Sequence, residues 1–178
     1  MLLATMPKEG EKAPGFTARD QHGRVVDLAH LKGGKVVLFF YPEDDSPTCT
    51  QQACDLRDHY SALKKAGYTV LGVSPEGEAS HEVFATKFNF PFSLLADEGM
   101  KIINAYGVWG PKQLYGRKYE GLHRTTFLID ERGVIERVIT GVRSKIHAQQ
   151  ILGKTAKATR TVEKKKSVKA RVLAAQQQ

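Results

Sequence analysis

The chain contains two cysteines, Cys49 and Cys54, and the residues before Cys49 could make its thiol a nucleophile. Ser46 suits the N-cap of a helix and Pro47 suits its first turn, which would place Cys49 third in that helix. The unpaired backbone N–H groups and the positive end of the helix dipole favour negative charge at this position. A cysteine there is favoured as the thiolate, the form that reacts with electrophiles and oxidants.

The same cysteine could instead be a small buried side chain of the core, because it lies in register with an apolar stripe along the expected helix. The stripe consists of Cys49, Ala53, Leu56, Tyr60 and Leu63. The acidic run Glu43–Asp45 would also oppose a thiolate if it lay close, and only a nearby cation would offset it. Spacing alone leaves the reactive and the buried interpretation evenly balanced.

The spacing of the two cysteines restricts what they can do together. Five residues of ideal helix separate the two Cα atoms by roughly 8 to 9 Å, whereas a disulfide needs them within about 7 Å. A disulfide between Cys49 and Cys54 therefore requires the helix to unwind, which couples oxidation to a conformational change. Two sulfurs on different sides of one helix make a poor metal site, and the spacing is not that of a Cys-x-x-Cys reductase. The six histidines show no metal-binding spacing, and we expect most of them at the surface.

Short apolar runs rich in β-branched residues alternate with segments of helical period, which predicts an α/β fold. We expect strands at residues 35–40, 68–74, 123–130 and 134–140, and a weaker strand at 92–95. We expect helices at residues 47–66, 77–88, 98–106 and 145–152. Residues 109–121 contain three glycines and a proline and predict a long irregular loop beside a functional site. Cys49 follows the most apolar strand, at the end where open α/β sheets place their sites.

The composition is that of a globular protein, with 41% hydrophobic and 26% charged residues among 178, and we expect one domain at residues 7–153. The net charge is +8, but eight basic residues and one acidic residue lie in residues 154–178. We expect this segment to be a flexible basic tail, and any binding of nucleic acid to depend on it.

The longest unbroken apolar run, residues 36–41, is much shorter than the roughly 20 residues of a membrane-spanning helix. The first six residues are apolar but lack the basic leader and the cleavage site of a signal peptide, and Met6 could serve as the start. These features predict a cytoplasmic protein with reduced cysteines and no membrane partner.

Two segments of the chain resemble a known family. Residues 41–58, YPEDDSPTCTQQACDLRD, resemble the active-site signature of peroxiredoxins, specifically of the bacterioferritin-comigratory-protein or PrxQ subfamily. Residues 109–130, WGPKQLYGRKYEGLHRTTFLID, resemble the second signature of that subfamily, and the likeness extends from about residue 7 to residue 152. The resemblance implies a thioredoxin-like fold, with a central mixed β-sheet flanked by helices, and a thiol-dependent peroxidase.

The resemblance also implies a role for individual residues. Cys49 is the peroxidatic cysteine, whose thiolate attacks the peroxide and becomes a sulfenic acid. Ser46, in place of the commoner threonine, hydrogen-bonds the thiolate or the peroxide, and Arg124 supplies the stabilising cation. Pro42 shapes and shields the pocket. Thr48, where the subfamily often has glycine, could narrow it and alter the preference among peroxides.

Cys54 matches the resolving position of this subfamily, whose thiol condenses with the sulfenic acid to an intramolecular disulfide. Thioredoxin or a similar dithiol donor is then the expected reductant, the substrates are hydrogen peroxide and organic hydroperoxides, and no metal or organic cofactor is needed. The resemblance suggests a monomer or weak dimer. Two other functions remain open: a thiol redox sensor or exchange protein without high peroxide turnover, and a nucleic-acid-binding module that uses the basic tail.

Overall fold

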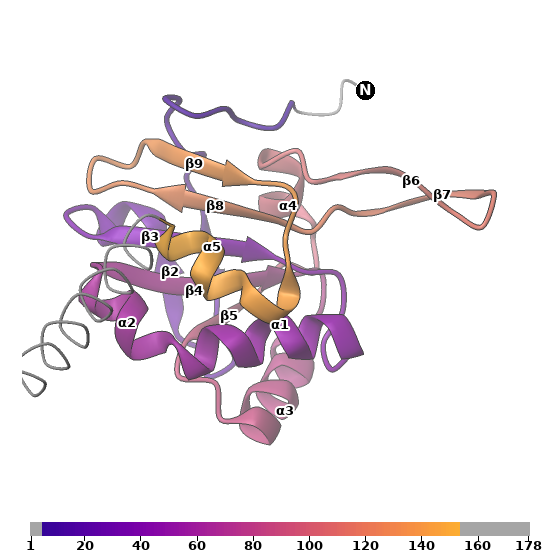
Figure 1. Ribbon diagram of the computed structural model, residues 1–178, viewed down its shortest axis with the longest axis horizontal. Coiled ribbons are helices and arrows are strands. Elements are labelled where there is room, and N and C mark those ends of the chain that lie inside the picture. Colours follow the sequence, from indigo (N-terminus) through magenta and orange to yellow (C-terminus); the bar gives the residue numbers. More distant parts are fainter. Residues whose placement is uncertain (1–4, 154–178) are drawn as a thin grey trace, which may run out of the picture.

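A computed structural model describes residues 5–153 and contains a central sheet of five strands in the order β5-β4-β3-β8-β9 (Figure 1). The strands are β3 (Lys35–Phe40), β4 (Tyr68–Ser74), β5 (Ser93–Ala96), β8 (Thr125–Ile129) and β9 (Ile135–Ile139). β3 runs parallel to β4, β4 runs parallel to β5, and β8 lies antiparallel to both β3 and β9. The mixed α/β architecture with a central sheet is as expected, and β3 and β4 occupy the expected residues.

Both faces of this sheet are buried, because successive side chains of β3 point alternately into two apolar layers. Val36, Leu38 and Phe40 enter one layer, which also contains residues of α4 (Lys101–Ala105) and the 3₁₀-helix η1 (Leu28–Leu31). Val37 and Phe39 enter the other layer. That layer is covered by α1 (Pro47–Asp58), α2 (Tyr60–Lys65), α3 (Glu78–Phe88) and α5 (His147–Leu152). The Cys49 side chain belongs to this second layer.

Three expected helices differ from the observed ones. The helix expected at residues 47–66 is broken at His59, which caps α1 and leaves α2 as a separate helix. The helix expected at 98–106 is shorter, and the one expected at 145–152 begins as the 3₁₀-helix η2 (Ser144–Ile146) before α5. The remaining expected helix, at residues 77–88, is observed as α3, which starts after Gly77 as its N-cap. These differences do not move Cys49 or Cys54 out of α1.

The prediction of an irregular loop at residues 109–121 is wrong. β6 (Trp109–Leu114) and β7 (Arg117–Leu122) form a two-stranded antiparallel hairpin that projects from the body of the protein (Figure 1). Tyr115 and Gly116 connect the strands with φ angles of 47° and 77°, as a two-residue hairpin turn requires. Pro111 is tolerated because a two-stranded ribbon has free edges. A second hairpin, β1 (Thr17–Arg19) with β2 (Val25–Asp27), was not expected.

The basic tail expected at residues 154–178 and the start at Met1 lie outside the described residues. Within residues 5–153, no helix combines the length and the apolar character needed to cross a membrane.

Candidate active site

Cys49 lies at the start of α1, directly after the loop that leaves the central strand β3. Ser46 has extended backbone angles and its carbonyl accepts the first helical bond, from the Thr50 N–H at 2.8 Å. Pro47 is the first helical residue, so Cys49 is third in the helix, as expected. Its side chain is only 2% exposed, because it packs in the apolar layer beneath the sheet. Cys49 is therefore a buried residue and also occupies the helix position that favours a thiolate.

Arg124 is the cation next to Cys49. It directly precedes β8, which pairs with β3 so that Thr125 lies opposite Phe40. The pairing brings Arg124 to the edge of the sheet where β3 ends and α1 begins. Its Nη2 donates to the Cys49 Sγ at 3.1 Å. Arg124 was expected within the strand, and its position just before β8 instead leaves its side chain free to reach across to α1.

Gln52 also lies in the site, and sequence analysis did not identify it. The side chain is fully buried, and its Oε1 accepts a hydrogen bond from the Nη1 of Arg124. The amide nitrogen of Gln52 has no hydrogen-bond partner within residues 5–153. This orientation follows from chemistry, since a reversed amide would place a donor against the guanidinium. The spacing of three residues from Cys49, on one face of a helix, was the available signal.

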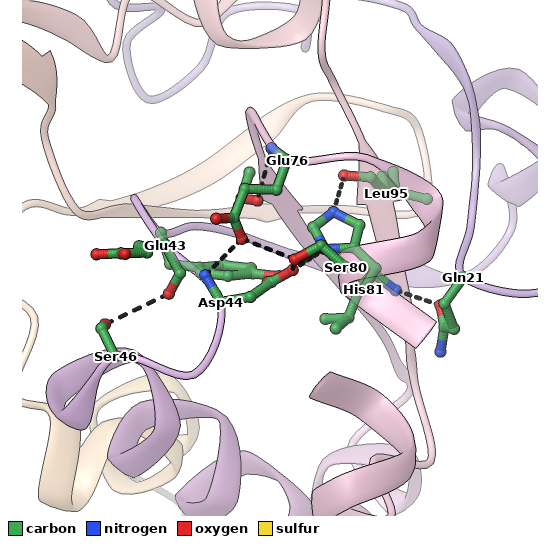
Figure 2. Close-up of polar contacts among 11 residues, drawn as sticks. Gln21, Glu43, Asp44, Ser46, Glu76, Ser80, His81 and Leu95 are labelled. Atoms are coloured by element: carbon green, nitrogen blue, oxygen red, sulfur yellow. Dashed lines mark hydrogen bonds and ion pairs between the residues drawn. The ribbon is translucent and has the colours of Figure 1, made fainter. Parts of the chain in front are cut away.

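Ser46 and Pro42 are both partly buried in the loop between β3 and α1. Ser46 is the N-cap by its backbone, but its hydroxyl makes no capping bond. The hydroxyl instead donates to the Glu43 carbonyl at 3.3 Å, within the same loop (Figure 2). The expected side-chain cap is therefore absent, and the hydroxyl closes the loop instead.

Cys54 is on the same helix as Cys49, and both thiols are free. Cys54 is partly buried and packs against the apolar layer that α1 covers. This burial raises the pKa of the Cys54 thiol. The intact helix keeps the two sulfurs apart, since five helical residues exceed the span of a disulfide.

Two of the three acidic residues before α1 are paired with side chains of α3. His81 is fully buried, and its Nδ1 lies 2.7 Å from an oxygen of Asp44, whose side chain is 4% exposed (Figure 2). Asp45 pairs with Lys87 at 2.6 Å on the surface. Burial by itself would raise the pKa of Asp44, but hydrogen bonds from His81 and Tyr41 more than offset it and lower the pKa. Both partners, His81 and Lys87, belong to α3, so this helix holds the acidic part of the loop before α1.

Asp44, Glu76 and His81 bring three potential metal ligands within 4.8 Å of one another. These residues are already hydrogen-bonded to one another. His81 Nδ1 lies 2.7 Å from the Asp44 carboxylate, and the Asp44 backbone N–H donates to Glu76 Oε2 at 2.7 Å. We therefore describe the group as a hydrogen-bonded network. His81 and His147 are buried, while the other four histidines are exposed, so the expectation of mostly surface histidines is correct for four of six.

The last two helices of the described chain, η2 and α5, pack against α1. Asp55 accepts a hydrogen bond from the Ala148 N–H at 2.7 Å, at the first turn of α5. Gln51 accepts one from the Ser144 hydroxyl at 2.8 Å. The helix that carries both cysteines is thus fixed to residues 144–148 as well as to the sheet.

Comparison with known proteins places this site in a family. Residues 10–138 match the model of the AhpC/TSA family. A putative peroxiredoxin bcp of Coxiella burnetii is 46% identical over 145 residues, which is 82% of this chain and 96% of the relative. The chain belongs to the peroxiredoxins. The peroxiredoxin Bcp of Escherichia coli is 42% identical over 145 residues, covering 82% of this chain and 93% of that protein.

Solved structures agree with this assignment. The bacterioferritin comigratory protein of Xanthomonas campestris, studied for its alkyl peroxide reduction activity, aligns with a TM-score of 0.74 and 30% identity. The alignment covers 81% of this peroxiredoxin and 91% of that chain. The fold is therefore the thioredoxin-like fold of this family, and the protein is a thiol-dependent peroxidase.

Proposed function

We propose that Cys49 is the peroxidatic cysteine of this peroxidase. The observation that supports this assignment best is the hydrogen bond at 3.1 Å from Arg124 Nη2 to Cys49 Sγ. A guanidinium in contact with a sulfur at the first turn of a helix stabilises the thiolate, because both the cation and the helix dipole favour negative charge. Cys49 is the described thiol with such a partner, whereas burial raises the pKa of Cys54.

In the proposed reaction, the Cys49 thiolate attacks one peroxide oxygen. The S–O bond forms as the O–O bond breaks, and the second oxygen leaves with a proton as water or as an alcohol. Arg124 stabilises the negative charge that develops on the leaving oxygen. Ser46 reorients its hydroxyl from the Glu43 carbonyl towards the peroxide, and Pro42 shields the pocket from water. Hydrogen peroxide and organic hydroperoxides are both proposed substrates.

Cys54 then resolves the sulfenic acid. Its sulfur attacks the Cys49 sulfur, which forms the disulfide and releases water. This step requires α1 to unwind between the two residues, and with it the contacts of Gln51 and Asp55 to residues 144–148 must loosen. A dithiol protein of the thioredoxin type reduces the disulfide by exchange through a mixed disulfide. Such donors act in reducing compartments, so we propose that the protein works in the cytoplasm.

The test is peroxide consumption with a thioredoxin system, comparing wild type with Cys49→Ser and Cys54→Ser. We expect Cys49→Ser to be inactive. We expect Cys54→Ser to form a sulfenic acid, trapped by a dimedone-type reagent, and to turn over poorly. Equal activity of Cys49→Ser and wild type would contradict the proposal, and consumption of no more than one peroxide per protein by wild type would indicate a redox sensor.

A further inference from the structure

The buried pair of Asp44 and His81 is a part of the molecule that the proposed reaction does not use. The Asp44 side chain accepts from the Tyr41 hydroxyl at 2.6 Å, the Ser80 hydroxyl at 2.7 Å and His81 Nδ1 at 2.7 Å. The Asp44 backbone N–H donates to Glu76 at 2.7 Å. Figure 2 shows Glu76, Ser80 and His81 beside Asp44. A single residue of the loop between β3 and α1 is therefore fixed by four hydrogen bonds.

Both ring nitrogens of His81 lie within hydrogen-bond distance of oxygen atoms. Its Nε2 lies 3.0 Å from the Leu95 carbonyl oxygen, which can only accept a hydrogen bond. Its Nδ1 faces the Asp44 carboxylate, which the low pKa of Asp44 keeps ionised. The other groups facing the pair are Tyr41, directly after β3, Glu76, two residues before α3, and Ser80 within α3. Burial and the adjacent Asp44 raise the pKa of Tyr41, so its hydroxyl remains a donor. Both carboxylate oxygens of Asp44 and both ring nitrogens of His81 therefore have hydrogen-bond partners, which offsets the cost of burying these polar groups.

The pair fixes the loop that carries Pro42 and Ser46, the two residues proposed to face the peroxide. Asp44 lies midway between Pro42 and Ser46, the two loop residues assigned to the pocket. The next residue, Asp45, has a left-handed φ of 58°, so the loop turns sharply immediately after the fixed point. Fixing Asp44 to α3 and β5 therefore fixes the direction in which the chain enters α1. No bond of the pair reaches Cys49 itself within the described residues.

We propose that His81 and Asp44 are positioning residues for the peroxide reaction, which hold Pro42 and Ser46 in the geometry that the substrate needs. The proposal rests on the proposed role of Cys49. It assigns to α3 a function in substrate alignment that is separate from the stabilisation of the thiolate by Arg124. Small displacements of aligning groups have large effects on rate, because the reacting atoms must meet in a narrow range of geometry.

The experiment compares two reagents for the same sulfur. Peroxide requires the aligned pocket, whereas iodoacetamide reacts with the thiolate and needs no peroxide site. For His81→Gln and for Asp44→Asn, we expect the rate constant with hydrogen peroxide to fall at least about tenfold, and the rate constant with iodoacetamide at the same pH to stay close to that of wild type. Because the two residues act as one unit, the double variant should lose no more than the worse single variant.

Two further variants make the comparison specific. Lys87→Gln breaks the exposed pair with Asp45, which joins the same loop to the same helix, and should leave both rates unchanged because surface ion pairs contribute little. Ser80→Ala removes one bond of the network and tests the proposal if His81→Gln does not fold.

The results separate this proposal from the proposed function. An unchanged peroxide rate in folded His81→Gln, or an equal loss with both reagents, would overturn the positioning role. Failure of wild type itself to react with peroxide through Cys49, checked with Cys49→Ser, would instead count against the proposed function.

Discussion

The Nη2 of Arg124 lies 3.1 Å from the Sγ of Cys49, although the two residues are 75 positions apart in the chain. The contact exists because β8 pairs with β3 in a register that ends where α1 begins. No carboxylate forms an ion pair with Arg124 among residues 5–153. The guanidinium bonds the Cys49 sulfur and the uncharged amide oxygen of Gln52, so neither of these contacts neutralises its charge.

Replacing Arg124 should slow the first chemical step. We expect Arg124→Ala to reduce the rate constant with hydrogen peroxide about 100-fold, because a charged donor to the transition state is lost. The rate constant of Arg124→Lys should lie between those of wild type and Arg124→Ala, because lysine keeps the charge but lacks the planar group of N–H donors. Stopped-flow fluorescence measures the rate. Arg117→Ala, in the exposed hairpin β6–β7, serves as the matched control, and a loss of similar size in that variant would refute the assignment.

Gln52 should tune how strongly Arg124 acts on the sulfur. Gln52→Glu places a carboxylate against the guanidinium that Gln52 contacts, so part of its charge is neutralised. We expect the peroxide reaction of this variant to need a higher pH than that of wild type. Gln52→Met removes the hydrogen bond without adding charge and should lower the rate with a smaller change in pH dependence. A pH–rate profile that is the same for wild type and Gln52→Glu would show that Gln52 only fills space.

Asp55 should restrain the unwinding of α1. Asp55→Ala removes the acceptor for the Ala148 N–H, so α5 is held less tightly against the helix. We expect the free energy of unfolding to fall by about 1 to 2 kcal/mol. We also expect faster disulfide formation after one equivalent of peroxide, measured from the mass shift of the quenched protein. Asp58→Ala changes an exposed carboxylate on the same helix, 60% accessible, and is the control. Slower or unchanged disulfide formation in Asp55→Ala would contradict the coupling.

His147 should make the folded protein sensitive to mild acid. Its Nε2 bonds the Thr126 hydroxyl at 2.8 Å, and burial lowers its pKa from 6.5 to about 4. The unfolded chain thus binds a proton between these pH values while the folded protein does not. Stability from this residue is complete above about pH 6.5 and is lost as the pH falls towards 4, by about 3 kcal/mol at most. Urea denaturation across this range should show a shallower pH dependence for His147→Gln, and parallel curves for the two proteins would exclude the effect.

Local sequence patterns predicted the parts of the site that depend on neighbouring residues. The apolar run of β3, the N-cap position of Ser46 and the third helical position of Cys49 follow from spacing within about ten residues. The role of Arg124 was accessible only through resemblance to a family. An arginine next to a strand is otherwise more often a solvated residue.

The remaining features depend on contacts that no local pattern encodes. Asp44 and His81 are 37 residues apart, and their pairing requires α3 to pack beside the loop before α1. The hairpin of β6 and β7 was mistaken for a loop because its glycines and proline are weak strand formers, whereas the turn at Tyr115 and Gly116 determines the pairing. Gln52 was missed because its importance arises from Arg124, a distant residue.

The uninterrupted helix that carries both cysteines also bears on how long a sulfenic acid on Cys49 would persist. In the proposed cycle, the sulfenic acid on Cys49 persists until α1 opens, and during that interval a second peroxide can oxidise it further to a sulfinic acid, which a dithiol donor does not reduce. A firmer helix lengthens the interval, and a looser one shortens it. In the proposed cycle, we therefore expect loss of the contacts of Gln51 and Asp55 with residues 144–148 to raise the peroxide concentration that the protein tolerates before it is inactivated.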